Sequence, residues 1–370
     1  MKEVYFTKAA IATGLGGTLS ENWHRLMSGE SAIKPINYFK TDRLDYHNAS
    51  FVDDLRSDPN VNYISELTKR VLDQIGEVPR DTQIIWTGIK GNAQFIESNQ
   101  KMDKPYLALH YRDWVADHLG IENIGIEVNA ACASSTVGLA LAAQKINSGE
   151  CKSVLVCAAD LASRFVHNGF SALKALSPTV VRPFDKSRDG LALGDGAVAI
   201  LLTNKETAEK DEYPLLGRLT GWGIANDANH ITGPARDGCG LILSIENALK
   251  MAGLKANEIE AFCAHGTGTV YNDGMELAAV ETIFGDRHLP IFSIKGSIGH
   301  TLGAAGGIEA ALCLMALGEK TTLPTSGLIE AEDLAKKRIS NKAQAFVGNN
   351  ILTTNSGFGG VNAALIIEKV

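Results

Sequence analysis

Residues 126–140 read Ile-Glu-Val-Asn-Ala-Ala-Cys-Ala-Ser-Ser-Thr-Val-Gly-Leu-Ala, an apolar approach to Cys132 followed by small residues. The approach is typical of a strand, and the small residues predict a helix that begins just after the cysteine. Unpaired amides and the dipole at a helix N-terminus would favour a thiolate there. A free cysteine can equally be a small buried residue, so this stretch alone does not decide between a nucleophile and a packing role.

Composition narrows the class of protein. The chain has 370 residues, of which 45% are hydrophobic and 21% charged, which suits two domains or two fused halves of one globular protein. Its net charge of −7 argues against general binding of nucleic acid, because no basic excess neutralises phosphates. The six cysteines show neither zinc spacing nor a disulfide framework, so a reducing cytoplasm is expected.

Neither a secretory leader nor a membrane span is expected. The first eight residues lack the apolar core of a signal peptide. The most apolar candidate, residues 301–317, contains Glu309 and several glycines, which indicates a buried helix.

An internal repeat organises the chain. A small-residue segment follows Cys132 and ends at Gly149, and a similar segment follows His300 and ends at Gly318. Each segment is followed downstream by a glycine turn and an apolar strand. The repeat predicts two related α/β halves, with the two small-residue helices packed closely in a central layer. The predicted halves are residues 1–208 and 209–370.

Two histidines of the second half follow apolar strands. His265 enters a glycine-rich loop in which Thr267 and Thr269 offer hydroxyls to an extended polar ligand. A lone histidine is more often structural, but His300 opens the second small-residue helix, at the position that Cys132 occupies in the first. If the halves are pseudo-symmetric, Cys132 and His300 face each other across the central helices.

Lys295 lies at the end of another apolar strand, five residues before His300. It is either a solvated surface amine or a buried one. A buried lysine requires a carboxylate, and Glu309 on the following helix is the candidate.

Five motifs resemble the elongating β-ketoacyl-[acyl carrier protein] synthases, within the thiolase-like condensing enzymes. They lie in the order and spacing of that family, at residues 129–135, 182–196, 264–269, 293–307 and 355–360. The resemblance implies a thiolase-like α/β fold, in which two pseudo-symmetric βαβαβαββ halves form a five-layered α-β-α-β-α sandwich.

The resemblance also implies a catalytic triad of Cys132, His265 and His300, supported by Lys295 and Glu309. Cys132 would take an acyl group from the phosphopantetheine of an acyl carrier protein. A malonyl thioester would then lose CO2, and a carbon–carbon bond would form to give a β-ketoacyl product two carbons longer. Two imidazoles aimed at the thioester oxygen would stabilise the enolate.

Further roles follow from the same resemblance. Backbone donors at Cys132 and Phe358 would hold the oxyanion, and Phe358 would also act as a gate. Thr267 and Thr269 would bind pantetheine. Lys174 would contact the acyl carrier protein, with Lys69 and Arg70 as weaker candidates. No metal or redox cofactor is expected, and the chain would form a homodimer or a heterodimer with a related ketosynthase or chain-length-factor-like subunit.

Two alternatives share the fold. A non-elongating partner subunit would have lost the nucleophile or a histidine, whereas all three are present. A thiolase would need a second cysteine near the C-terminal glycine turn, and residues 353–362 contain none. An acyltransferase would not need Lys295 together with His300. The stretch before Cys132 is shorter than in the family, and Ser356 stands where the family motif has its first Phe. These departures favour a specialised polyene or polyketide pathway.

Overall fold

The computed structural model describes residues 2–41, 46–58, 61–93, 97, 108–122 and 125–370. Part of the shortened stretch before Cys132 lies outside these residues. The strands are β1 (Tyr5–Thr13), β2 (Ile33–Pro35), β3 (Asn48–Ser50), β4 (Gln83–Trp86), β5 (Ile126–Glu127), β6 (Ser153–Asp160), β7 (Leu193–Gly194), β8 (Gly196–Thr203), β9 (Gly217–Asn226), β10 (Ala261–Cys263), β11 (Ile291–Phe292), β12 (Asn350–Gly357) and β13 (Val361–Glu368).

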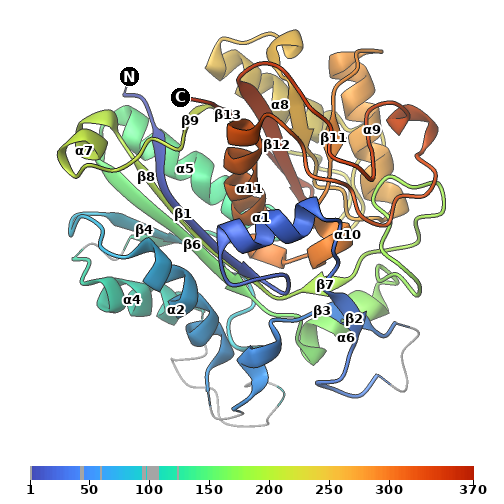
Figure 1. Ribbon diagram of the computed structural model, residues 1–370, viewed down its shortest axis with the longest axis horizontal. Helices are drawn as coiled ribbons and strands as arrows, with labels where there is room; N and C mark the ends of the chain where they lie inside the picture. The colour runs from blue at the N-terminus through green and yellow to red at the C-terminus, as the bar shows by residue number, and fades with distance from the viewer. Residues whose placement is uncertain (1, 42–45, 59–60, 94–96, 98–107, 123–124) are drawn as a thin grey trace.

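The α-helices alternate with these strands (Figure 1). They are α1 (Leu19–Met27), α2 (Tyr63–Ile75), α4 (Ala108–Leu119), α5 (Ser134–Ser148), α6 (Arg164–Ala172), α7 (Lys205–Lys210), α8 (Cys239–Ala252), α9 (Val270–Phe284), α10 (Lys295–Ile298) and α11 (Ala305–Glu319). Short 3₁₀ turns lie at η1 (Asp53–Arg56), η3 (Ala256–Glu258), η4 (Leu302–Ala304) and η5 (Asp333–Ala335).

Ten of the strands in the described residues form two groups of five with the same topology, and β2, β3 and β7 form a separate small sheet. The first runs β5-β4-β6-β8-β1 and the second β11-β10-β12-β13-β9. In each group the first three strands named are parallel to one another, and the last two join antiparallel. Among the described strands, a short pairing of Tyr5 and Phe6 with β9 connects the groups. The shared order confirms the internal repeat, while the predicted boundary at residue 208 stays a prediction.

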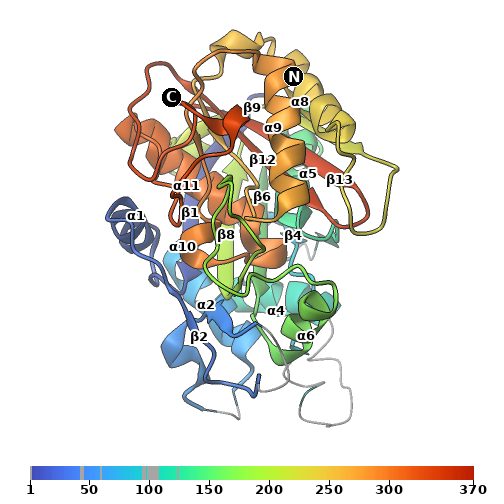
Figure 2. The same cartoon turned by 90° about the vertical axis from the view of Figure 1, so that its right-hand side faces the viewer.

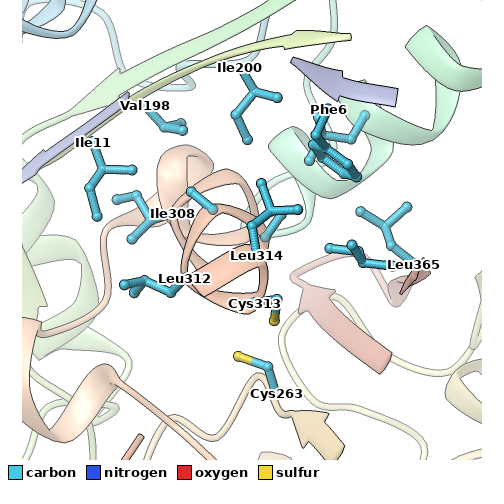
Figure 3. Packing of buried hydrophobic residues seen from close by; sticks show 14 of the residues in the cluster. Phe6, Ile11, Val198, Ile200, Cys263, Ile308, Leu312, Cys313, Leu314 and Leu365 are labelled. Carbon is cyan, nitrogen blue, oxygen red and sulfur yellow. The ribbon is translucent and has the colours of Figure 1, made fainter. Parts of the chain in front are cut away.

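Helices cover both groups and fill the space between them. The outer layers are α2 with α4 on the first group and α8 with α9 on the second, and α8 and α9 contact each other (Figures 1 and 2). Helices α5 and α11 lie between the groups. Figure 3 shows Ile308, Leu312 and Leu314 of α11 among side chains from β1, β8 and β13. The arrangement is the predicted five-layered sandwich.

Small residues allow the central helices to pack closely against each other and against the strands. A Cβ on Gly306 would lie 1.9 Å from Thr136 Oγ1 on α5, and one on Gly307 would lie 2.8 Å from Val198 on β8. In the described part of the chain, Leu302–Glu319 is the one helical stretch with the length and hydropathy of a membrane span. Because 83% of that stretch is buried, it belongs to the core, as the sequence predicts.

His167 is a buried imidazole whose protonation should affect stability. It lies on α6, is 0% exposed and packs edge-on against Phe39, and neither ring nitrogen has a hydrogen-bond partner among the residues that the structure describes. Burial lowers the pKa of His167 to about 4. In the unfolded chain the histidine pKa is ~6.5. Between pH ~6.5 and about 4, His167 is therefore protonated in the unfolded chain but neutral in the native protein. The free energy of unfolding falls as the pH drops through this range.

We expect His167→Phe to make the unfolding free energy less sensitive to acid. Between pH ~6.5 and about 4 the slope should decrease by at most about 1.4 kcal/mol per pH unit. Urea unfolding at a series of pH values measures it. An unchanged slope in the variant would contradict the assignment of His167 as a neutral buried group.

Candidate active site

Cys132 lies on a tight turn between β5 and α5. Ala131 adopts a left-handed backbone with φ of 50°, which a residue with a side chain adopts rarely. Ser134 stabilises the turn, since its hydroxyl accepts from the amide of Ala130 at 2.8 Å and donates to the carbonyl of Ala131 at 2.6 Å. The turn places Cys132, only 6% exposed, on the wall of a cavity of about 1160 Å³.

The resting sulfur is a thiol, not a thiolate. Burial raises the pKa of Cys132 to about 11, although Lys295, Lys90 and a hydrogen bond from the amide of Phe358 act in the opposite direction. The expectation that a helix N-terminus alone favours the thiolate is therefore wrong, because desolvation outweighs it. A neighbouring base must take the proton when Cys132 reacts.

His265 follows β10 and reaches the same cavity. Its loop is held by two buried carboxylates from α9. Glu276 accepts hydrogen bonds from the backbone amides of His265 and Gly266, both at 2.7 Å. Asp273 accepts a hydrogen bond from the backbone amide of Thr267 at 3.0 Å. Burial, together with neighbouring Asp273, raises the pKa of Glu276 to about 8. In the sequence, Asp273 and Glu276 look only like acidic residues at the start of a helix.

Lys295 and Glu309 form a buried ion pair. Their side chains are 2% and 1% exposed, and Lys295 Nζ donates to Glu309 Oε1 and, at 2.6 Å, to the carbonyl of His265. Asn355 Nδ2 donates to the other carboxylate oxygen of Glu309 at 2.8 Å. The structure thus contains the contact predicted from the need of a buried amine for a counter-charge.

His300 lies just before η4 and α11, as Cys132 lies just before α5. Its amide donates to the carbonyl of Ala192 at 2.7 Å, and its carbonyl accepts from Gly194 at 3.0 Å. The imidazole stands edge-on to that of His265, with ring centroids 5.2 Å apart, and its nitrogens have no hydrogen-bond partner in the described part of the chain. Burial, reinforced by Lys295, lowers the pKa of both histidines. Both rings are therefore neutral.

One cavity thus collects a thiol and two neutral imidazoles, drawn from both halves. Residues 114–208 match the family model "Beta-ketoacyl synthase, N-terminal domain", and residues 216–328 match "Beta-ketoacyl synthase, C-terminal domain". Together these matches cover more than half of the chain. The chain belongs to the β-ketoacyl synthase family.

Relatives of this β-ketoacyl synthase extend over its whole length. A 3-oxoacyl-[acyl-carrier-protein] synthase 2 of Coxiella burnetii is 26% identical, covering 100% of this chain and 99% of the relative. That alignment spans 410 positions, so the 370-residue chain lacks segments that the relative has.

Two solved structures share its fold. The ishigamide ketosynthase/chain length factor has a TM-score of 0.88 and 28% identity, covering 100% of this chain and 99% of that one. The ketosynthase ApeO in complex with its chain length factor ApeC, from Xenorhabdus doucetiae, has a TM-score of 0.85 and 25% identity, covering 100% and 98%. These likenesses identify the fold as that of the thiolase-like ketosynthases.

Other predicted residues surround the synthase cavity. Thr267, Thr269, Lys174 and Ser356 all line it. Phe358 also lines it and stacks on Phe170 of α6, with ring centroids 5.6 Å apart. The hydroxyls of Thr267 and Thr269 lie 2.9 Å apart.

Two weaker candidates lie elsewhere. Lys69 and Arg70 are on α2, bonded to Asp73 and to Asp54, and neither lines the cavity. Nothing in the structure therefore singles them out as contacts for a carrier protein.

The synthase site also contains a residue without a predicted role. Asn355, at the end of β12, is 0% exposed and connects His265, Glu309 and Thr136. Its position inside a glycine-rich motif was visible in the sequence, but its contacts come from distant parts of the chain. Within the described residues, no group of three or more His, Cys, Asp or Glu side chains is arranged to hold a metal ion.

Proposed function

We propose that this chain is the catalytic ketosynthase subunit of a carrier-protein-dependent pathway that makes polyketide or polyene chains. The observation that carries the proposal is the single cavity containing Cys132, His265 and His300. A thiol beside neutral bases suits thioester exchange, and two imidazoles suit stabilisation of an enolate. The likeness to the ishigamide and ApeO ketosynthases supports the choice of pathway.

The first half-reaction is acyl transfer to Cys132. A histidine takes the thiol proton, the sulfur attacks the acyl thioester, and the pantetheine thiol leaves with that proton. The amides of Cys132 and Phe358 donate to the oxyanion of the tetrahedral intermediate. Phe358, stacked on Phe170, separates this step from entry of the malonyl group by acting as the gate.

The second half-reaction forms the carbon–carbon bond. The malonyl thioester loses CO2, and its enolate oxygen is stabilised by His265 and His300. The enolate carbon attacks the acyl group, and the Cys132 sulfur leaves and regains a proton. Lys295 and Glu309 support the histidines through the carbonyl of His265 and through Asn355.

The substrates enter on a partner. The proposed partner is an acyl carrier protein, with Lys174 at the cavity mouth as its contact and the hydroxyls of Thr267 and Thr269 along the pantetheine. A second copy of the chain, or a chain-length-factor-like subunit, completes the dimer, as in the relatives that are ketosynthase/chain length factor complexes. The six free cysteines fit a cytoplasmic location. The chemistry requires neither a metal nor a redox cofactor.

The experiment supplies acyl-carrier protein and malonyl-carrier protein and follows CO2 and product mass. Wild-type protein should release CO2 and form a β-ketoacyl product two carbons longer. Cys132→Ala should make none, whereas Cys239→Ala, a change to a second thiol on the cavity wall, should retain activity. Extension by Cys132→Ala at the wild-type rate would refute the mechanism. If wild-type protein extended no chain, either by itself or together with its partner subunit, the result would favour the non-elongating alternative.

A further inference from the structure

The side chain of Asn355 uses every hydrogen-bonding group that it has. Its Oδ1 accepts a hydrogen bond from the hydroxyl of Thr136, which lies on α5, four residues after Cys132. Its Nδ2 lies 2.8 Å from Glu309 Oε2 and 2.9 Å from His265 Nδ1. One buried amide therefore connects the cysteine helix, the lysine–glutamate pair and the first histidine.

The surroundings determine which way this amide points. Burial raises the pKa of Glu309, but the Lys295 ammonium bonded to it favours the carboxylate, and a carboxylate can only accept. The opposite orientation would place Asn355 Oδ1 against Glu309 Oε2, two acceptors at hydrogen-bond distance. Nδ2 therefore faces Glu309 and His265, and Oδ1 faces Thr136.

The orientation of Asn355 in turn decides the tautomer of His265. An amide nitrogen has no lone pair to offer, so the second Nδ2 hydrogen is donated to His265 Nδ1. A neutral imidazole with an accepting Nδ1 carries its proton on Nε2. His300 differs, because neither ring nitrogen is bonded to any described residue and both tautomers are open to it.

We propose that Asn355 is a positioning residue that fixes His265 as the Nε2–H tautomer. His265 then acts as a permanent donor to the thioester oxygen. His300, free in either tautomer, first takes the proton from Cys132 and passes it to the leaving pantetheine thiol, and then donates to the malonyl thioester oxygen together with His265. The inference rests on the proposed condensation chemistry and divides it between the two histidines. Gly306 leaves room for this network, since a Cβ there would lie 2.5 Å from Asn355 Oδ1.

The test is Asn355→Leu, which keeps the approximate size of the side chain but removes both donors and the acceptor. His265 Nδ1 then loses the hydrogen bond that fixes it as an acceptor, so both tautomers become open to the imidazole. Loss of one preorganised donor predicts a fall of about 10²-fold in malonyl-carrier decarboxylation. Acylation of Cys132 by acyl-carrier protein should change less than about threefold, because it uses His300 and backbone donors.

Two further variants separate positioning from folding. Thr136→Val removes the anchor of Oδ1 but introduces no charge, and should lower decarboxylation about tenfold, the scale of losing an orienting partner. Thr353→Val is the matched control on β12, because the Thr353 hydroxyl is buried without a partner. It should leave both half-reactions unchanged.

The decisive readout does not require activity. ¹⁵N NMR of histidine-labelled protein, with the His265 resonance assigned by its loss in His265→Gln, should show the proton on Nε2 in wild-type protein and a mixture of both tautomers in Asn355→Leu. A wild-type Nδ1–H tautomer, or decarboxylation by Asn355→Leu within threefold of wild type, overturns the proposal. Failure of wild-type protein to condense would instead overturn the proposed function and leave the tautomer result intact.

Discussion

Replacing His300 with Ala should nearly abolish decarboxylation of malonyl-carrier protein, while Cys132→Gln should continue to release CO2 without extending a chain. The imidazole of His300 is buried, neutral and unbonded to protein, so it is free to act on substrate. Removing a general acid–base group of this kind costs about 10²–10⁴-fold in rate. Cys132→Gln removes the nucleophile, but its amide occupies the place of an acyl thioester.

Both rates are measured as CO2 release, with product mass as the second readout. His230→Ala is the matched control, since His230 is an exposed imidazole on the same cavity. Because burial lowers the pKa of His265 and His300, the neutral forms persist below pH ~6.5, and decarboxylation should lose its rate only at lower pH. A His300→Ala rate within tenfold of wild type, or an acid limb centred at ~6.5, would contradict this assignment.

The internal repeat was predictable because both copies place a run of small residues directly after a predicted site residue. Small residues after Cys132 and after His300 gave matching helix starts, and the structure places α5 and α11 together between strand groups of identical order. The Lys295–Glu309 contact was predictable for a similar reason. A buried ammonium requires a counter-charge, and the following helix offered the Glu309 carboxylate near its start.

Burial and long-range contacts were not predictable. The sequence placed Cys132 at a helix start but did not show how completely the turn removes the sulfur from water, so the thiolate expectation was wrong. Asn355 lies 219 positions from Thr136, and its role exists only once β12 lies beside α5 and α11. Asp273 and Glu276 look like ordinary acidic residues of a helix start until the amides of the His265 loop converge on them.

Lys295→Met should destabilise the protein by about 3–5 kcal/mol, because it leaves the Glu309 carboxylate buried without a counter-charge. Urea unfolding measures the change in free energy. Lys69→Met is the control, since Lys69 and its partner Asp73 are about half exposed and such a pair contributes roughly 0–1 kcal/mol. A loss below about 1 kcal/mol in Lys295→Met would contradict a fully buried pair.

The double variant Lys295→Met with Glu309→Gln separates stability from catalysis. It removes both charges together, so most of the lost stability should return, as when buried ion pairs are replaced by neutral groups. Activity should not return with it. The methionine cannot bond the carbonyl of His265, and the neutral amide at position 309 no longer forces Asn355 to point its nitrogen toward His265. Recovery of both stability and activity would mean that the Lys295–Glu309 pair contributes to stability alone.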